Sequence, residues 1–142
     1  ANLPDMLAAL ARSQLSRFDE MQARRRQLVD RYRVGLDTID GCQVVPGKPD
    51  ERSADHLMVV VLPDGVDRAE VSAAMAAGGI GTSIHFRPVH TLSWFRDNAL
   101  LGPTGVAVAD SLAARTLSLP LHAGLGDDEV DRVVGSLVSA LP

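Results

Sequence analysis

The sequence has a single cysteine, Cys42, so no disulfide can form within the chain. Although 46% of its residues are hydrophobic, it lacks any apolar run near the ~20 residues that a membrane-spanning helix requires. No basic segment followed by an apolar one marks a secretory signal at its start. These absences predict a soluble globular protein that resides, by default, in the cytoplasm.

Lysine is almost absent: the chain carries thirteen arginines and one lysine, Lys48. That lysine stands in the Pro- and Gly-rich stretch Pro46–Pro49, which is typical of a turn. Chemistry that proceeds through a lysine amine therefore has one candidate residue, and it lies in a predicted loop. The formal net charge of -4 argues against a general nucleic-acid-binding protein, since phosphate contacts usually need a basic surface.

A chain of 142 residues corresponds to one ordinary domain with a sizeable core. Up to about Thr38, apolar residues recur at helical spacing with a phase slip at residues 13–16, which predicts one kinked helix or two helices in tandem. The segment His56–Leu62 is apolar on both faces and predicts a central strand. The other predicted elements are strands at 42–46, 80–86 and 116–121, and helices at 67–77, 91–98, 104–115 and 127–141. This order predicts an α/β fold, described more closely as an α+β sandwich.

Two of the predicted helices have a clear inner face. Asp67 is placed to cap the helix at 67–77, whose apolar face contains Val71 and Met75. The last helix is expected to turn five residues inward, namely Val130, Val133, Val134, Leu137 and Val138.

The segment Gly79–His90, GIGTSIHFRPVH, is the strongest candidate site. As a strand it sends one set of side chains to a core (Ile80, Thr82, Ile84, Phe86) and the other set to the opposite face (Gly81, Ser83, His85, Arg87). A guanidinium beside an imidazole offers charge-assisted hydrogen bonds to phosphate or carboxylate. A surface arginine beside a hydrogen-bonded structural histidine is the alternative interpretation.

A metal site is not indicated. His85 and His90 are five residues apart across a proline, with no cysteine nearby, and this is not a recognised zinc spacing.

Two further features have ordinary structural interpretations. Arg24–Arg26 fan over about 200° of a helix, so a solvated face paired with neighbouring acids is favoured over a nucleic-acid contact. Trp94 and Phe95 could stack on a nucleobase, and core packing is slightly favoured.

The pattern G-I-G-T-x-x-H-F-R-x-x-H at 79–90, followed by R-T-L-S-L-P-L at 115–121, resembles the C-terminal part of the pyridoxal-phosphate-dependent nucleotide-sugar aminotransferases of the DegT/DnrJ/EryC1/StrS family. Further motifs fit the same family in the same order, namely Asn2–Asp5, Ala8-Ala9, Gln14-Leu15 and Arg24–Arg26. The resemblance runs from Asn2 to about Val138. It implies a helical segment at 1–40 that closes the large domain and leads into the small one. It also implies that residues 41–142 form the small C-terminal α+β domain of a fold-type I transferase.

The resemblance also implies an activity and a set of site residues. Relatives pass an amino group from glutamate through pyridoxal phosphate to a keto-sugar nucleotide, in deoxyamino-sugar and polysaccharide biosynthesis. The loop that carries the substrate-binding candidates lies at the mouth of the active site, and these candidates are His85, Phe86, Arg87 and His90. Asn2 corresponds to a residue that reaches the cofactor phosphate across a homodimer. The aldimine lysine lies upstream of this chain in the family, so we expect no catalytic residue here and no aldimine on this chain alone.

Three hypotheses stay open at this point. The chain is the C-terminal part of a transaminase that associates with an N-terminal half, or a non-catalytic binding or dimerisation module derived from that family, or an unrelated small α/β binding domain. In the first case the partners are a nucleotide-sugar, an amino-acid donor and a second subunit or half, with neither nucleic acid nor membrane among them.

Overall fold

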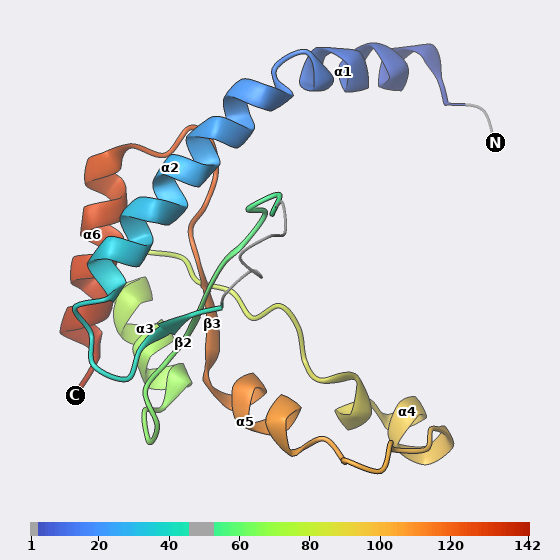
Figure 1. Ribbon diagram of the computed structural model, residues 1–142, viewed down its shortest axis with the longest axis vertical. Helices are drawn as coiled ribbons and strands as arrows, with labels where there is room; N and C mark the ends of the chain where they lie inside the picture. Colours follow the sequence, from blue (N-terminus) through green and yellow to red (C-terminus); the bar gives the residue numbers. More distant parts are fainter. Residues whose placement is uncertain (1–2, 46–52) are drawn as a thin grey trace.

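The computed structural model describes residues 3–45 and 53–142 as helices packed on a small sheet (Figure 1). The predictions for Asn2 and Lys48 fall outside the described residues. A 3₁₀ turn, η1 (Val89–Thr91), precedes the fourth helix. The other elements are α1 (Asp5–Leu15), α2 (Phe18–Leu36), β1 (Gln43–Val44), β2 (Met58–Val61), α3 (Arg68–Ala77), α4 (Ser93–Asn98), α5 (Ala107–Arg115), β3 (Thr116–Leu119) and α6 (Asp127–Ala140). The mixed α/β class predicted from the sequence is confirmed.

The sheet has three antiparallel strands in the order β1-β2-β3, so β2 is central, as its apolar sequence predicted. Met58 pairs with Leu119 and Val61 pairs with Thr116, which fixes the register of β2 against β3. Strands pair with both edges of β2, and three of its four residues are buried.

The core lies where α2, α3 and α6 pack with the sheet. Val71 and Met75 of α3 are buried as predicted, and the Asp67 side chain caps that helix by accepting a hydrogen bond from the N–H of Ala69 at 2.7 Å. On α2, the buried Tyr32 donates its hydroxyl to the carbonyl oxygen of Pro120 at 2.8 Å. Burial raises the pKa of Tyr32 above its usual value, because the charged phenolate is poorly solvated there.

The N-terminal residues form two helices in tandem, which decides between the two predicted alternatives. The break falls at Ser16 and Arg17, where the Ser16 hydroxyl donates to the carbonyl oxygen of Ser13 at 3.0 Å. Such side-chain bonds compete with the backbone ladder of a helix. Beyond the break, α1 projects away from the sheet and has no buried residue (Figure 1).

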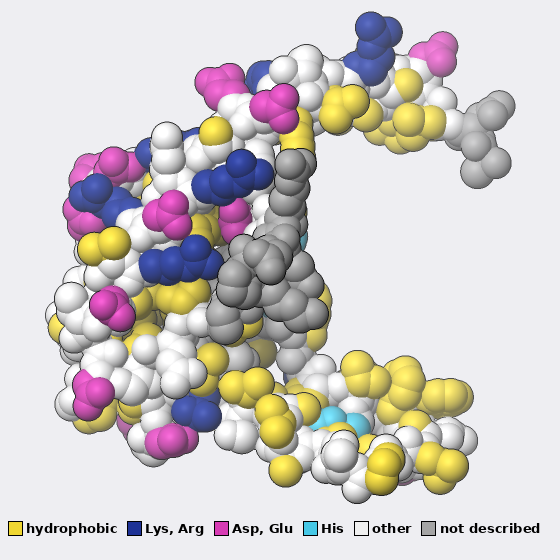
Figure 2. Space-filling view, in the orientation of Figure 1, with side chains coloured by type: hydrophobic (Ala, Val, Ile, Leu, Met, Phe, Trp, Pro, Cys, Tyr) yellow, Lys and Arg dark blue, Asp and Glu magenta, His cyan; other side chains and the backbone are white. Residues whose placement is uncertain are grey.

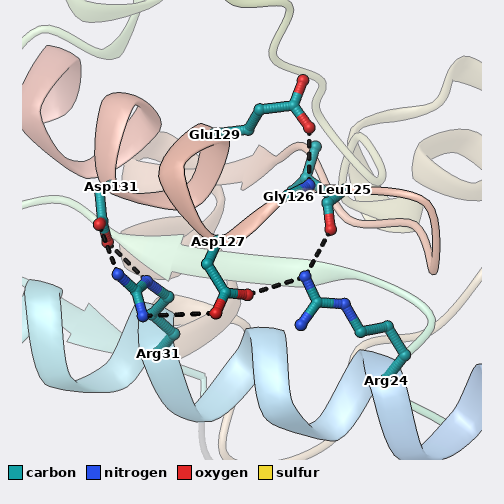
Figure 3. Close-up of polar contacts among 7 residues, drawn as sticks. All are labelled: Arg24, Arg31, Leu125, Gly126, Asp127, Glu129 and Asp131. Carbon is teal, nitrogen blue, oxygen red and sulfur yellow. Dashed lines mark hydrogen bonds and ion pairs between the residues drawn. The ribbon is translucent and has the colours of Figure 1, made fainter.

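Ion pairs join α2 to the start of α6 (Figure 3). Arg24 contacts the Asp127 carboxylate at 2.8 Å and donates to the carbonyl oxygen of Leu125 at 2.7 Å. Arg31 binds Asp131 with two hydrogen bonds, of 2.7 and 2.5 Å. The predicted pairing of Arg24–Arg26 with neighbouring acids is wrong: Arg24 pairs with an acid 103 positions further along the chain, on α6. The Nε of Arg25 is buried without a hydrogen-bond partner among the described residues.

Because of the Arg31–Asp131 pair, we expect the stability of the folded chain to decrease in acid. The Arg31 guanidinium lowers the pKa of Asp131 below its ordinary value of 3.8, chiefly through these hydrogen bonds. A carboxylate with a lowered folded-state pKa stabilises the fold above its ordinary pKa and loses that effect as the pH falls through the lowered value. We expect Asp131→Asn to be less stable than the parent in urea unfolding near pH 7, with the difference shrinking below about pH 4. An unchanged difference at low pH, or none at neutral pH, would show that the pair does not stabilise the chain.

The predicted strand at 80–86 is wrong over most of its length. Only Ser83 pairs with the sheet, through a bridge to Ser118 on β3, and Ile80 is the one member of its predicted core face that is buried. Ile84 and Phe86 are exposed in the described chain, at 46% and 82%. Pairing between this segment and β3 does not extend beyond the Ser83–Ser118 bridge. At one end of β3, Pro120 has no N–H to donate, and at the other end β3 begins directly after α5 ends at Arg115.

Several predicted core positions are also exposed here. Val138 of α6 is exposed, because that helix meets the core along Val130, Val133 and Leu137. The helix α5 has no buried residue, although its apolar spacing was correctly recognised as helical. Trp94 and Phe95 on α4 are exposed as well, so the core packing favoured for them is not found in this chain.

Candidate functional site

A small hollow of about 100 Å³ lies where the residues before β2, the end of β3 and the loop after α3 meet. His85 lines it and is held by a hydrogen bond of 3.0 Å between its Nδ1 and the Oγ of Ser118. Ser118 is buried in the middle of β3, and its backbone pairs with that of Ser83 through bonds of 2.8 and 3.1 Å. The sheet therefore fixes both the loop and the ring of His85.

His90 lies in a different and larger hollow, of about 740 Å³. Its Nε2 is 2.7 Å from the Oδ1 of Asp110 on α5, so the side chain ties the η1 turn to that helix. Val89, Phe95 and Leu101 form apolar walls. This hollow combines an imidazole–carboxylate pair with apolar surface, which suits a ligand that has both polar and flat apolar parts.

Phe86 and Arg87 lie in neither of these hollows. Both side chains are exposed, and no hydrogen bond or ion pair to Arg87 occurs within residues 3–45 and 53–142. The structure thus brings the substrate-binding candidates onto one exposed segment but places His85 and His90 in separate hollows, with Arg87 between them in sequence.

Sequence reasoning missed three side chains that contact or adjoin these histidines. Ser118 lies within the predicted strand at 116–121 and Asp110 within the predicted helix at 104–115, and neither was a candidate site residue. His56 stands at the start of the central strand's apolar run and lines the small hollow with His85. No local pattern in the sequence marks these contacts, because each joins residues that are far apart in the chain.

Nothing among the described residues forms a group of three or more side chains suited to a metal ion. The described residues include no lysine, so none of their side chains can hold a pyridoxal phosphate cofactor as an imine. These residues therefore do not fit the reacting end of that cofactor.

Apolar side chains are exposed along two projecting parts of the molecule (Figure 2). One is α1 with the residues beside it, and the other is the segment through η1 and α4 (Figure 1). The residues concerned are Leu3, Met6, Leu7, Leu10, Leu15 and Phe18 on the first, and Phe86, Val89, Leu92, Trp94, Leu100 and Leu101 on the second. Exposed apolar surface of this extent typically marks an interaction face. None of the described helices is long and apolar enough to cross a membrane.

Solved structures with this arrangement are aminotransferases. The aminotransferase TlmJ from Streptoalloteichus hindustanus matches with a TM-score of 0.84 and 30% identity, over 96% of this chain and 36% of that one. S. venezuelae DesV, solved in complex with a ketimine intermediate, matches with a TM-score of 0.86 and 29% identity, over 97% of this chain and 36% of that one. The fold is therefore part of a fold-type I aminotransferase.

Comparison of sequences identifies the family of aminotransferases to which the chain belongs. The chain is 36% identical over 137 residues to the spore coat polysaccharide biosynthesis protein SpsC of Bacillus subtilis, which is 94% of this chain and 35% of SpsC. The family model for DegT/DnrJ/EryC1/StrS aminotransferases matches residues 1–138, and the chain belongs to this pyridoxal-phosphate-dependent family. The resemblance read from the motifs is confirmed, and the chain spans about a third of the length of these relatives.

Proposed function

We propose that this chain is the substrate-binding C-terminal portion of a sugar aminotransferase that moves an amino group from glutamate to a keto-sugar nucleotide. The family match over residues 1–138 is the observation that carries the proposal. In this assignment His85, Phe86, Arg87 and His90 contact the substrates, and Asn2 contacts the phosphate of the cofactor. The exposure of the segment that carries the first four supports such a role, because substrate must reach them.

The activity belongs to a larger assembly in this proposal. Residues 1–40 close the large domain and residues 41–142 form the small one, as the family resemblance implies. The apolar faces of α1 and of the segment through α4 then pack on an N-terminal half or on a second subunit. We place the assembly in the cytoplasm, where a chain with one cysteine needs no oxidising compartment.

A non-catalytic binding or dimerisation module is the second candidate. The single lysine, Lys48, matches no family motif, and this fits both candidates because the family's aldimine lysine lies upstream of these residues. The two candidates differ in whether the chain supports amino transfer once the rest of the fold is supplied.

A chimera tests this difference. The part of SpsC that matches this chain is replaced by residues 1–142, and the chimera is loaded with pyridoxal phosphate. We expect glutamate to convert the bound cofactor to its amine form, which is visible by absorbance without knowledge of the sugar, and UDP or TDP to bind. A chimera that folds and holds the cofactor but neither reacts with glutamate nor binds a nucleotide would favour the non-catalytic module.

Arg87→Ala is the informative variant in that chimera. A charge-assisted hydrogen bond to an anionic ligand contributes about 1.5–3 kcal/mol, so nucleotide or glutamate binding should weaken by that amount. Its urea unfolding should be nearly unchanged, because Arg87 is exposed. Arg33→Ala, another exposed arginine, whose hydrogen bond to Asp30 stays within α2, is the matched control and should leave glutamate binding intact.

A further inference from the structure

We infer that His56 and His85 form a binding subsite for one small oxyanion, either a carboxylate or a single phosphoryl group, in the hollow between the residues before β2, the end of β3 and the loop after α3. The proposed function assigns His85 to substrate in general and gives His56 no role. This inference deepens that function and rests on it only for the source of the anion.

The hollow presents donors whose positions the sheet fixes. The Nδ1 of His85 is occupied by the Oγ of Ser118 at 3.0 Å, which leaves Nε2 as the ring nitrogen available to a ligand. Ser118 is itself 5% exposed and bonded through its backbone to Ser83. His56, from the residues that lead into β2, lines the same hollow, as does Ser83 with its hydroxyl.

Size and charge select the ligand. A hollow of about 100 Å³ admits a carboxylate or one phosphoryl group and is too small for a nucleoside. None of the described residues that line it is acidic, and two of them, His56 and His85, carry imidazole rings that can donate to an anion. Gly81 has no side chain and Ser83 has a small one, so a ligand can approach the backbone of the loop closely.

A metal ion is a poorer match for the same side chains. Two imidazoles with two serine hydroxyls provide at most two strong ligands for zinc, which is usually held by at least three protein groups. No third His, Cys, Asp or Glu joins them within the described part of the chain.

The four histidines of the chain make a direct test, because each can be assigned by one substitution. The ring signals of His56, His85, His90 and His122 are followed by NMR in the 142-residue chain, at fixed pH and ionic strength, while sodium phosphate, sodium glutamate or sodium chloride is added. We expect phosphate or glutamate to shift His56 and His85 together along one saturable curve, with chloride inert. His122, which does not line the hollow, should stay in place, and His90 should not follow the same curve as His56 and His85.

Variants identify the donors. His56→Gln, at an exposed position, should weaken binding at least tenfold without affecting the fold. Ser118→Ala should weaken it about threefold or more, because the ring of His85 loses the contact that orients it. His122→Ala is the matched control and should bind like the parent.

The binding curves distinguish the two possible anions, and other results would contradict the inference. Saturation by phosphate alone assigns a phosphoryl group, and saturation by glutamate and also by acetate assigns a carboxylate. Parallel, unsaturable shifts of all four histidines, no shift at all, or a response to Zn²⁺ without one to either anion would overturn the inference. No turnover is needed, so a failure here leaves the chimera result standing, and a failed chimera leaves this binding result standing.

Discussion

Replacing Leu28 with alanine is expected to lower the free energy of unfolding of the chain by about 2–5 kcal/mol, the range for a leucine truncated in a packed core. Leu28 is fully buried on α2, within the core cluster that joins that helix to the sheet and to α6. Removing three carbon atoms there leaves a cavity that neighbours held by the sheet cannot close. Urea unfolding followed by circular dichroism measures the loss.

Leu7→Ala is the matched control, since it makes the same chemical change on α1, where Leu7 is 52% exposed. It should alter the stability of the isolated chain by no more than about 0.5 kcal/mol. If the two variants lost similar stability, α1 would be packed in solution, and the projecting position of that helix would be wrong.

The purified 142-residue chain is expected to show no glutamate-dependent amino transfer when pyridoxal phosphate is added. Transamination through this cofactor requires a lysine that forms the imine and moves the proton. The single lysine lies at Lys48, outside both family motifs, and none of the described residues that line the hollows at His85 and His90 is a lysine. We expect at most the weak imine absorbance of any surface amine.

The control is Lys48→Ala, which should behave like the parent in this assay. Turnover by the parent that disappears in Lys48→Ala would overturn the proposal that the reacting lysine comes from elsewhere in the assembly. Turnover that appears only in the chimera would support it, and would show that the chain contributes to binding rather than to the imine.

The elements of the fold were largely predictable because their signals are local. The apolar run before Leu62 specified a central strand, and Asp67 specified the start of α3 through a cap that forms within three residues. The phase slip at Ser13–Ser16 marked the break between α1 and α2. The segment at 80–86 was mispredicted because a strand needs neighbours, and alternation alone cannot reveal that the adjacent edge stops at Pro120.

For the candidate site, too, the sequence revealed local motifs but not the contacts between distant residues. Motif order in the sequence identified the family and pointed to His85 and His90, because each motif is a short run of residues that can be read without a structure. It could not show that Ser118 holds one ring and Asp110 the other, since each pair joins residues 33 or 20 positions apart. Nor could it show that His56 shares a hollow with His85.

The sequence by itself determined the family and the order of helices and strands outside residues 80–86, and it shows a single lysine that matches no family motif. The tertiary structure alone decided which apolar residues are covered in this chain and which are left on α1 and around α4. It alone separated the two histidines into different hollows. The physical reason is that hydrogen-bonded periodicity and capping act over a few residues, whereas burial and side-chain pairing depend on elements that meet only after the chain has folded.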